Sequence, residues 1–194
     1  MEFGFGLVLV LLSVFACLVV VALLVWLVMA YNRLIRRRNQ VEASWAQIDV
    51  QLKRRTDLIP NLVETVKGYA AHEKGTLEAV IQARNSAVAA AGSEPADRAD
   101  AENMLTQALG RLFALAEAYP DLKANQNFMA LQTELTGTED KISYARQFYN
   151  SAVQTYNTAI QSLPASIFAG MMGFRPKDFF QTAEAERGPV QVRF

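Results

Sequence analysis

The residues of this chain that could do chemistry are one arginine in an apolar stripe and the carboxylates that could pair with it. Arg55 falls where the helical spacing expects an apolar residue, and an unpaired guanidinium there would cost several kcal/mol. Candidate partners on the same or the facing helix are Asp49, Asp57, Glu134 and Glu139. The favoured interpretation is an ion-pair layer that fixes helix register. The alternative is a polar pocket that binds a ligand or docks a partner.

Other chemistry has little support in the sequence. Dimetal sites in helical bundles use Glu-x-x-His pairs, and the only histidine, His72, has no second histidine at zincin spacing. The only cysteine, Cys17, lies in an apolar run, so we expect no disulfide or thiolate metal site in the rest of the chain. The 19 basic and 19 acidic side chains leave no net charge to attract nucleic acid. We therefore expect no enzyme, no metal, no cofactor and no nucleic-acid partner.

An uncharged apolar run precedes these residues. Residues 3–32 contain no charged side chain, and about 20 apolar residues suffice to cross a bilayer as a helix. A cleaved signal peptide is disfavoured, because no basic residue precedes the run and the run is too long. A lipoprotein site at Cys17 is disfavoured by the bulky Phe15. We expect residues 1–32 to form one permanent transmembrane anchor.

Four arginines follow the apolar run directly: Arg33, Arg36, Arg37 and Arg38. Basic residues beside a span stay in the cytoplasm, so we expect the N-terminus outside and the remainder inside. Lipid headgroups explain the cluster sufficiently, at about 1 kcal/mol per residue.

Residues 33–163 show helical sequence patterns separated by short turns. Apolar residues recur at alternating steps of three and four residues. Pro60 interrupts the first long pattern, which starts at Val41, and no proline interrupts the last one, which starts at Phe128. We expect an all-α, antiparallel up-down four-helix bundle over residues 33–163, following the N-terminal transmembrane helix. Its two long helices cover about 33–71 and 121–163, and its two short ones 76–91 and 95–118. Because the long helices extend beyond the short ones, part of their shared seam needs another partner.

A Phe-, Met-, Gly- and Pro-containing tail, residues 164–194, completes the chain. Folding back onto the bundle is the favoured interpretation. The alternative is a partner or membrane interface, and its candidates are Phe168, Met171, Met172, Phe174, Phe179 and Phe180. The alternating residues 190–194 could add as a strand to a partner's sheet edge, which is a weak signal.

Several long motifs together resemble the LemA family. They include Trp45-Ala46-Gln47-Ile48-Asp49, Asp57-Leu58-Ile59-Pro60-Asn61-Leu62 and Tyr119-Pro120-Asp121-Leu122-Lys123-Ala124-Asn125-Gln126-Asn127-Phe128. The resemblance extends from the end of the apolar run to Phe180. It implies a membrane anchor followed by an antiparallel helical bundle, but no catalytic residues. Some relatives are encoded beside membrane zinc proteases or other envelope proteins, which suggests such a partner only by association.

Together these features favour a non-enzymatic, single-pass protein of the bacterial inner membrane. We expect a cytoplasmic helical bundle that acts as a scaffold or adaptor and self-associates. Two alternatives remain open: a ligand-sensing module that uses the polar layer around Arg55, and a module that organises the bilayer through the apolar tail.

Overall fold

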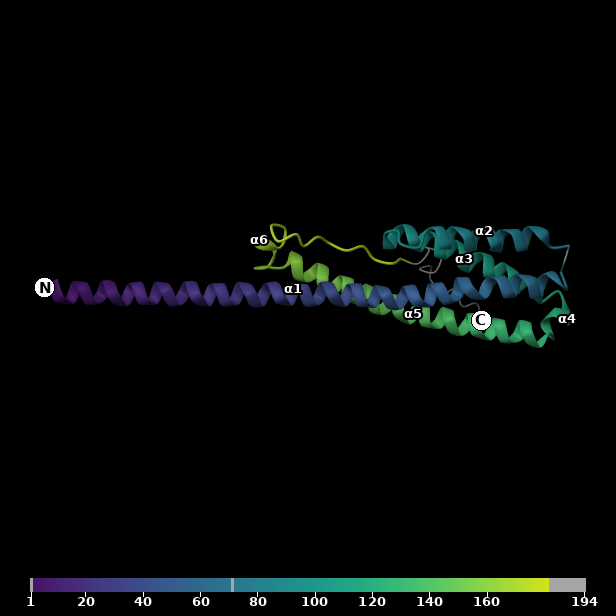
Figure 1. Ribbon diagram of the computed structural model, residues 1–194, viewed down its shortest axis with the longest axis horizontal. Coiled ribbons are helices and arrows are strands. Elements are labelled where there is room, and N and C mark those ends of the chain that lie inside the picture. The colour runs from purple at the N-terminus through teal and green to yellow at the C-terminus, as the bar shows by residue number, and fades with distance from the viewer. Residues whose placement is uncertain (1, 71, 182–194) are drawn as a thin grey trace, which may run out of the picture. The chain divides into compact units, whose positions relative to one another are not determined.

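The computed structural model describes residues 2–70 and 72–181, with side chains from residue 10 onward. The described residues form helices joined by turns and contain no strand (Figure 1). This confirms the all-α class with a long apolar N-terminal helix. The tail residues 182–194, including the expected edge-strand segment, lie outside the described residues. The helices are α1 (Glu2–Lys67), α2 (Lys74–Ala89), α3 (Pro95–Ala116), α4 (Pro120–Lys123), α5 (Gln126–Gln161) and α6 (Ser166–Ala169).

The helix ends follow local sequence signals. α1 runs without a break from the apolar residues through Pro60 to Lys67, so the expected anchor and first bundle helix are one element. α3 begins at Pro95, because a proline at the first helical position lacks only an N–H that would go unbonded anyway. The last long helix starts at Gln126 rather than 121, since the side chain of Asn125 accepts the Phe128 N–H at 3.0 Å and caps it.

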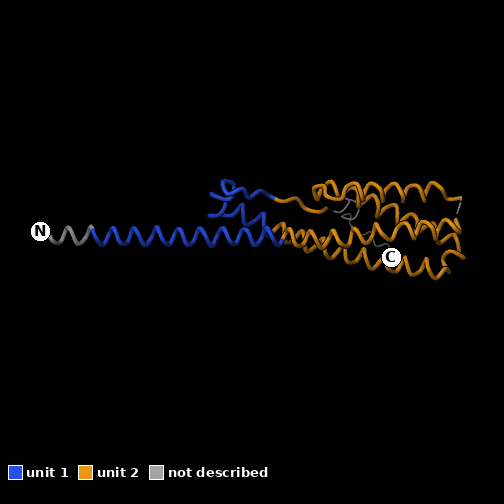
Figure 2. The backbone as a smooth tube through the Cα atoms, in the orientation of Figure 1, with its two compact units in different colours: residues 1–40, 155–176 blue, residues 41–154, 177–194 orange. Residues whose placement is uncertain are grey.

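The chain divides into two compact units, and each takes a segment of α1 and a segment of α5 (Figure 2). Unit 1 comprises residues 1–40 and 155–176, and unit 2 comprises residues 41–154 and 177–194. Unit 2 holds one apolar core to which α1, α2, α3, α4 and α5 all contribute. Its fully buried members include Ile59, Leu62, Val66, Val80, Leu105, Leu112 and Leu122.

Pairs of contacting residues give the helix directions in unit 2. Along α1, Trp45 packs on Tyr149 and Arg54 bonds to Glu134 of α5, so these two helices run antiparallel. Asp49 pairs with Arg98 and Arg55 pairs with Glu102, so residue numbers increase in the same sense along α1 and α3, and these two helices run parallel. These directions of α1, α3 and α5 are compatible with an up-down order.

Unit 1 contains the apolar stretch of α1 and the end of α5. The most apolar 18-residue stretch among the described residues of α1 contains no buried residue, and the helix is long and apolar enough to cross a membrane. Further along, Leu34 is buried and Trp26 meets Phe168 of α6 edge to face, with ring centroids 5.8 Å apart. Arg37 donates from Nη1 to the Thr155 carbonyl at 3.1 Å. Within unit 1, the described apolar side chains of α1 are therefore covered mainly between Trp26 and Leu34.

Candidate functional site

The centre of unit 2 is a polar layer built on Arg55 of α1, whose side chain is 1% exposed. Its Nη1 donates to Thr106 Oγ1 of α3 at 2.9 Å and to the Glu139 carboxylate of α5. Its Nη2 donates to the carboxylate and the carbonyl of Glu102 on α3. One guanidinium thus joins three helices, and its charge is balanced inside the bundle.

A second arginine extends this layer along α3. Arg98, with a side chain 5% exposed, lies 2.6 Å from the Asp49 carboxylate of α1. Its Nε is 3.7 Å from Glu102 Oε1, close enough for electrostatic attraction but too far for a hydrogen bond. The Arg98 guanidinium also lies 5.6 Å from the ring centroid of Trp45, a cation–π distance. Glu102, 2% exposed, therefore lies between two buried positive charges.

The structure corrects the expected set of partners for Arg55. Of the four candidate carboxylates, only Glu139 bonds to it. The other three pair with different cations: Asp49 with Arg98, Asp57 with Lys53, and Glu134 with Arg54.

Sequence reasoning missed Arg98 and Glu102. Both lie on the buried face of α3, in register with Leu105, Leu109 and Leu112. The signal was present in the sequence, because an arginine and a glutamate four residues apart continue the spacing of that apolar stripe. It was hidden by the ordinary expectation that charged residues near a helix start face solvent.

An aromatic cluster lies beside the polar layer in unit 2. The ring of Trp45 lies 5.2 Å from Tyr149 and 5.4 Å from Phe180, centroid to centroid. Tyr149 donates its hydroxyl to the Asp178 carbonyl at 2.9 Å. Burial raises the pKa of Tyr149 to about 12, and the nearby charges of Asp178 and Glu94 act in the same direction.

A side-chain amide adds to the contacts that hold the tail to α5. Asn150 donates from Nδ2 to the Phe180 carbonyl at 3.1 Å, and its Oδ1 accepts the Phe180 N–H at 2.9 Å. The Phe180 ring is fully buried and lies 5.1 Å below the Arg146 guanidinium. The Asn150 side chain thus bonds to both the N–H and the carbonyl of Phe180, as the backbone of a neighbouring strand would. This pair of bonds fixes the position of the backbone near residue 180.

The six tail residues expected as an interface are not equivalent. Phe168, Phe174 and Phe180 are buried against their own chain, as the fold-back interpretation requires. Met171 is 82% exposed, and Met172 and Phe179 are about half as exposed as Met171. The expected interface is thereby corrected for Phe168, Phe174 and Phe180, which are buried. Within unit 1, Leu163 and Ile167 are also exposed, at 78% and 68%.

The four arginines after the apolar run also differ from one another. Arg33 and Arg36 are exposed, while Arg37 and Arg38 are half-buried. Within the described residues, no group of three or more His, Cys, Asp or Glu side chains is placed to hold a metal ion.

These features define a class of protein: a helical bundle with a paired polar layer, joined through one continuous helix to an apolar segment able to cross a membrane. The chain belongs to the LemA family, whose family model matches residues 44–194. It is 28% identical to Magnetosome protein MamQ 2 of Paramagnetospirillum magneticum, over 92% of this chain and 75% of that protein. It is 26% identical to Protein LemA of Metamycoplasma hominis, over 83% of this chain and 73% of that protein.

Proposed function

We propose that this chain is a non-enzymatic, single-pass protein of the bacterial inner membrane, with its N-terminus outside. Its helical bundle lies in the cytoplasm, where it acts as a scaffold or adaptor and self-associates. The observation that carries the proposal is the exposure of the apolar face of α1. Most of the apolar side chains from Val10 to Met29 are exposed, on a helix that continues into the bundle core. Such a surface is stable only when lipid or another apolar partner covers it.

The orientation rests on the arginine cluster at residues 33–38, following the positive-inside tendency of membrane proteins. Labelling of single cysteines tests it in a Cys17→Ala background. A membrane-impermeant maleimide should label Glu2→Cys in intact spheroplasts. It should label Ser93→Cys, in the exposed turn before α3, only after permeabilisation. Labelling of Ser93→Cys in intact spheroplasts would reverse the topology.

The polar layer supports a structural role for Arg55 rather than a ligand site. Its side chain is almost fully buried, and its charge is met by Glu102 and Glu139. A ligand would have to displace these partners and would leave their charges unpaired, at a cost of several kcal/mol. A scaffold needs only the register that such a layer imposes.

Self-association is supported by two aromatic side chains one turn apart on the outer face of α5. Tyr144 is 74% exposed and Phe148 is 49% exposed. Exposed aromatic residues are enriched where protein surfaces meet. We propose that a second copy of this chain covers them, and that the partner of the adaptor role is another envelope protein, such as a membrane protease.

Mass photometry of the detergent-solubilised chain tests self-association. The wild type should be oligomeric at micromolar concentration, and the double variant Tyr144→Ser/Phe148→Ser should shift toward monomer. Val50→Ser is a matched control, because Val50 is an apolar residue on α1 whose exposure, 62%, lies between those of Tyr144 and Phe148. A monomeric wild type would remove self-association from the proposal.

A second candidate is a module that organises the bilayer. It is favoured by three exposed apolar residues spaced four apart after α5: Leu163, Ile167 and Met171, which are 78%, 68% and 82% exposed. That relatives of this chain are named as magnetosome proteins agrees with this candidate without establishing it. Electron microscopy of liposomes that contain the chain or Ile167→Ser/Met171→Ser tests the role of these residues in changing vesicle shape. Unchanged vesicle shape between the two would exclude them.

A further inference from the structure

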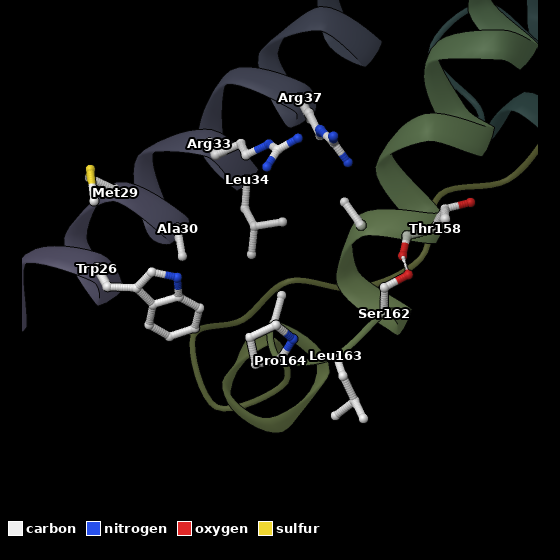
Figure 3. Close-up of a pocket in the computed structure, with 12 residues that line it drawn as sticks. Trp26, Met29, Ala30, Arg33, Leu34, Arg37, Thr158, Ser162, Leu163 and Pro164 are labelled. Atoms are coloured by element: carbon white, nitrogen blue, oxygen red, sulfur yellow. Dashed lines mark hydrogen bonds between the residues drawn. The ribbon is translucent and has the colours of Figure 1, made fainter. Parts of the chain in front are cut away.

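An open groove of about 570 Å³ lies in unit 1 between α1 and the end of α5 (Figure 3). Its volume is in the range of small-molecule sites, roughly 300–1,000 Å³. One wall carries apolar side chains, among them Trp26, Met29, Leu34 and Pro164. The other end carries the guanidinium groups of Arg33 and Arg37, which both extend from α1 toward α5 (Figure 3). The groove is therefore amphipathic, and along α1 its lining changes from apolar at Trp26 to charged at Arg37.

Within the part of the chain that the structure describes, no acidic side chain lines the groove beside the two arginines. The hydrogen bond from Arg37 Nη1 goes to an uncharged acceptor, the Thr155 carbonyl. Burial, followed by the charge of Arg33, lowers the pKa of Arg37. Arginine nevertheless stays protonated in proteins, so two positive charges share one site and favour a bound anion.

The position of the groove along α1 supplies the second argument. It begins at Trp26, within the apolar run, and ends at Arg37, within the arginine cluster. Under the proposed membrane span, this is the depth at which acyl chains give way to headgroups. Tryptophan is enriched at that depth in membrane proteins. A ligand that fits must be apolar at the Trp26 end and anionic at the Arg37 end.

The geometry points to a binding site for one anionic phospholipid of the cytoplasmic leaflet, with its phosphate between Arg33 and Arg37 and its acyl chains along Trp26 and Met29. This inference rests on the proposed membrane span. Guanidinium groups bind phosphate oxygens through paired hydrogen bonds. The site thus differs from a diffuse attraction of all four arginines to the surface, because Arg36 does not line the groove.

Quenching of Trp26 by brominated lipid tests the site in the full chain. Trp45→Phe leaves Trp26 as the only tryptophan. The protein is placed in nanodiscs that contain equal amounts of phosphatidylglycerol and phosphatidylcholine, with bromine on one lipid or the other. We expect phosphatidylglycerol to quench Trp26 more strongly, with a local enrichment of roughly fivefold or more. No quenching by either lipid would refute the membrane span itself, whereas equal quenching would refute the lipid site alone.

Charge-matched variants separate the site from surface electrostatics. At about 1 M salt the screening length falls to roughly 3 Å, so exposed charges contribute little. Arg33→Gln and Arg37→Gln should then abolish the enrichment, while Arg36→Gln should preserve it. Equal effects of the three variants would overturn the proposal. Circular dichroism shows whether each variant keeps its helical content.

A soluble headgroup distinguishes a lipid from a free phosphate compound. Millimolar glycerol 3-phosphate should leave the enrichment of phosphatidylglycerol unchanged, because it lacks the chains that contact Trp26. Loss of the enrichment on its addition would show that a soluble phosphate monoester competes for the arginines, and would overturn the assignment to a lipid.

Discussion

The substitution Arg55→Met should destabilise the protein strongly, although methionine fits an apolar core. It removes the positive charge that faces Glu102, a carboxylate only 2% exposed. What remains near Glu102 is Arg98 Nε at 3.7 Å, without a hydrogen bond. Removing one member of a buried ion pair typically costs about 3–5 kcal/mol, because the other charge stays buried. For a chain of this size that corresponds to a fall of roughly 6–20 °C in melting temperature.

The double variant Arg55→Met/Glu102→Leu should recover most of this loss. Replacing both charges by apolar side chains is often close to neutral. The remaining partners can adjust, since the Glu139 side chain is 35% exposed and Arg98 retains Asp49 at 2.6 Å. We expect the double variant to unfold within about 1–2 kcal/mol of the wild type.

Urea unfolding of the full chain in detergent, followed by circular dichroism, gives both free energies. The two single variants and the double variant form a cycle that isolates the coupling between the charges. Lys53→Met is the matched control on the same helix, because its pair with Asp57 is exposed and should cost less than about 1 kcal/mol. If Arg55→Met costs no more than Lys53→Met, the polar layer is not what holds the helices in register. If the double variant is as unstable as Arg55→Met, the loss comes from packing rather than from the stranded charge.

Three further predictions concern the tail and the turns. The pKa of Tyr149 is raised from 10 to about 12, so its contribution to the free energy of unfolding is full below pH 10 and is lost as the pH rises toward 12. Tyr149→Phe should reduce this alkaline loss by about 2–3 kcal/mol, measured by unfolding at pH 9 and at pH 12. Asn150→Ala removes both hydrogen bonds to Phe180 and should speed hydrogen exchange at the Phe180 amide. Exchange at the wild-type rate would show that the other contacts of the tail, ring packing and the Tyr149 hydrogen bond, suffice to hold it. Gly92 has a φ of +90°, and a side chain added at Gly110 inside α3 would meet open space. Gly92→Ala should therefore destabilise the protein and Gly110→Ala should stabilise it, each by about 1 kcal/mol in urea unfolding. A change of the same sign in both variants would contradict this reasoning.

Helix content was predictable because it depends on local patterns. The three–four spacing from Val41 to Tyr69 and from Phe128 to Leu163 predicts long helices. α1 and α5 contain most of these stretches, and each ends two residues earlier, at Lys67 and Gln161. The short helix α4 was not predicted, because a four-residue turn has no period to detect. Its start at Pro120 nevertheless follows the preference of proline for a first helical turn.

The polar layer was only partly predictable. Sequence spacing placed Arg55 at a buried position, and Arg55 is 1% exposed. It could not select the partner, because Asp57 and Glu139 both lie within two residues of a seam position, Asp57 near Arg55 and Glu139 beside Thr138. The choice depends on which helix faces the guanidinium, and that is fixed by how α3 and α5 pack against α1 in unit 2.

The sequence by itself determined the apolar segment, the helical class and the presence of a charged residue in the seam, because each follows from the order of residues within one helix. Only the tertiary structure decided that Glu102 meets Arg55, that Phe180 enters the core of unit 2, and that Arg33 and Arg37 share a groove with Trp26. These outcomes depend on contacts between residues far apart in the chain. Such contacts are selected by the joint packing of several helices, which no single stretch of sequence encodes.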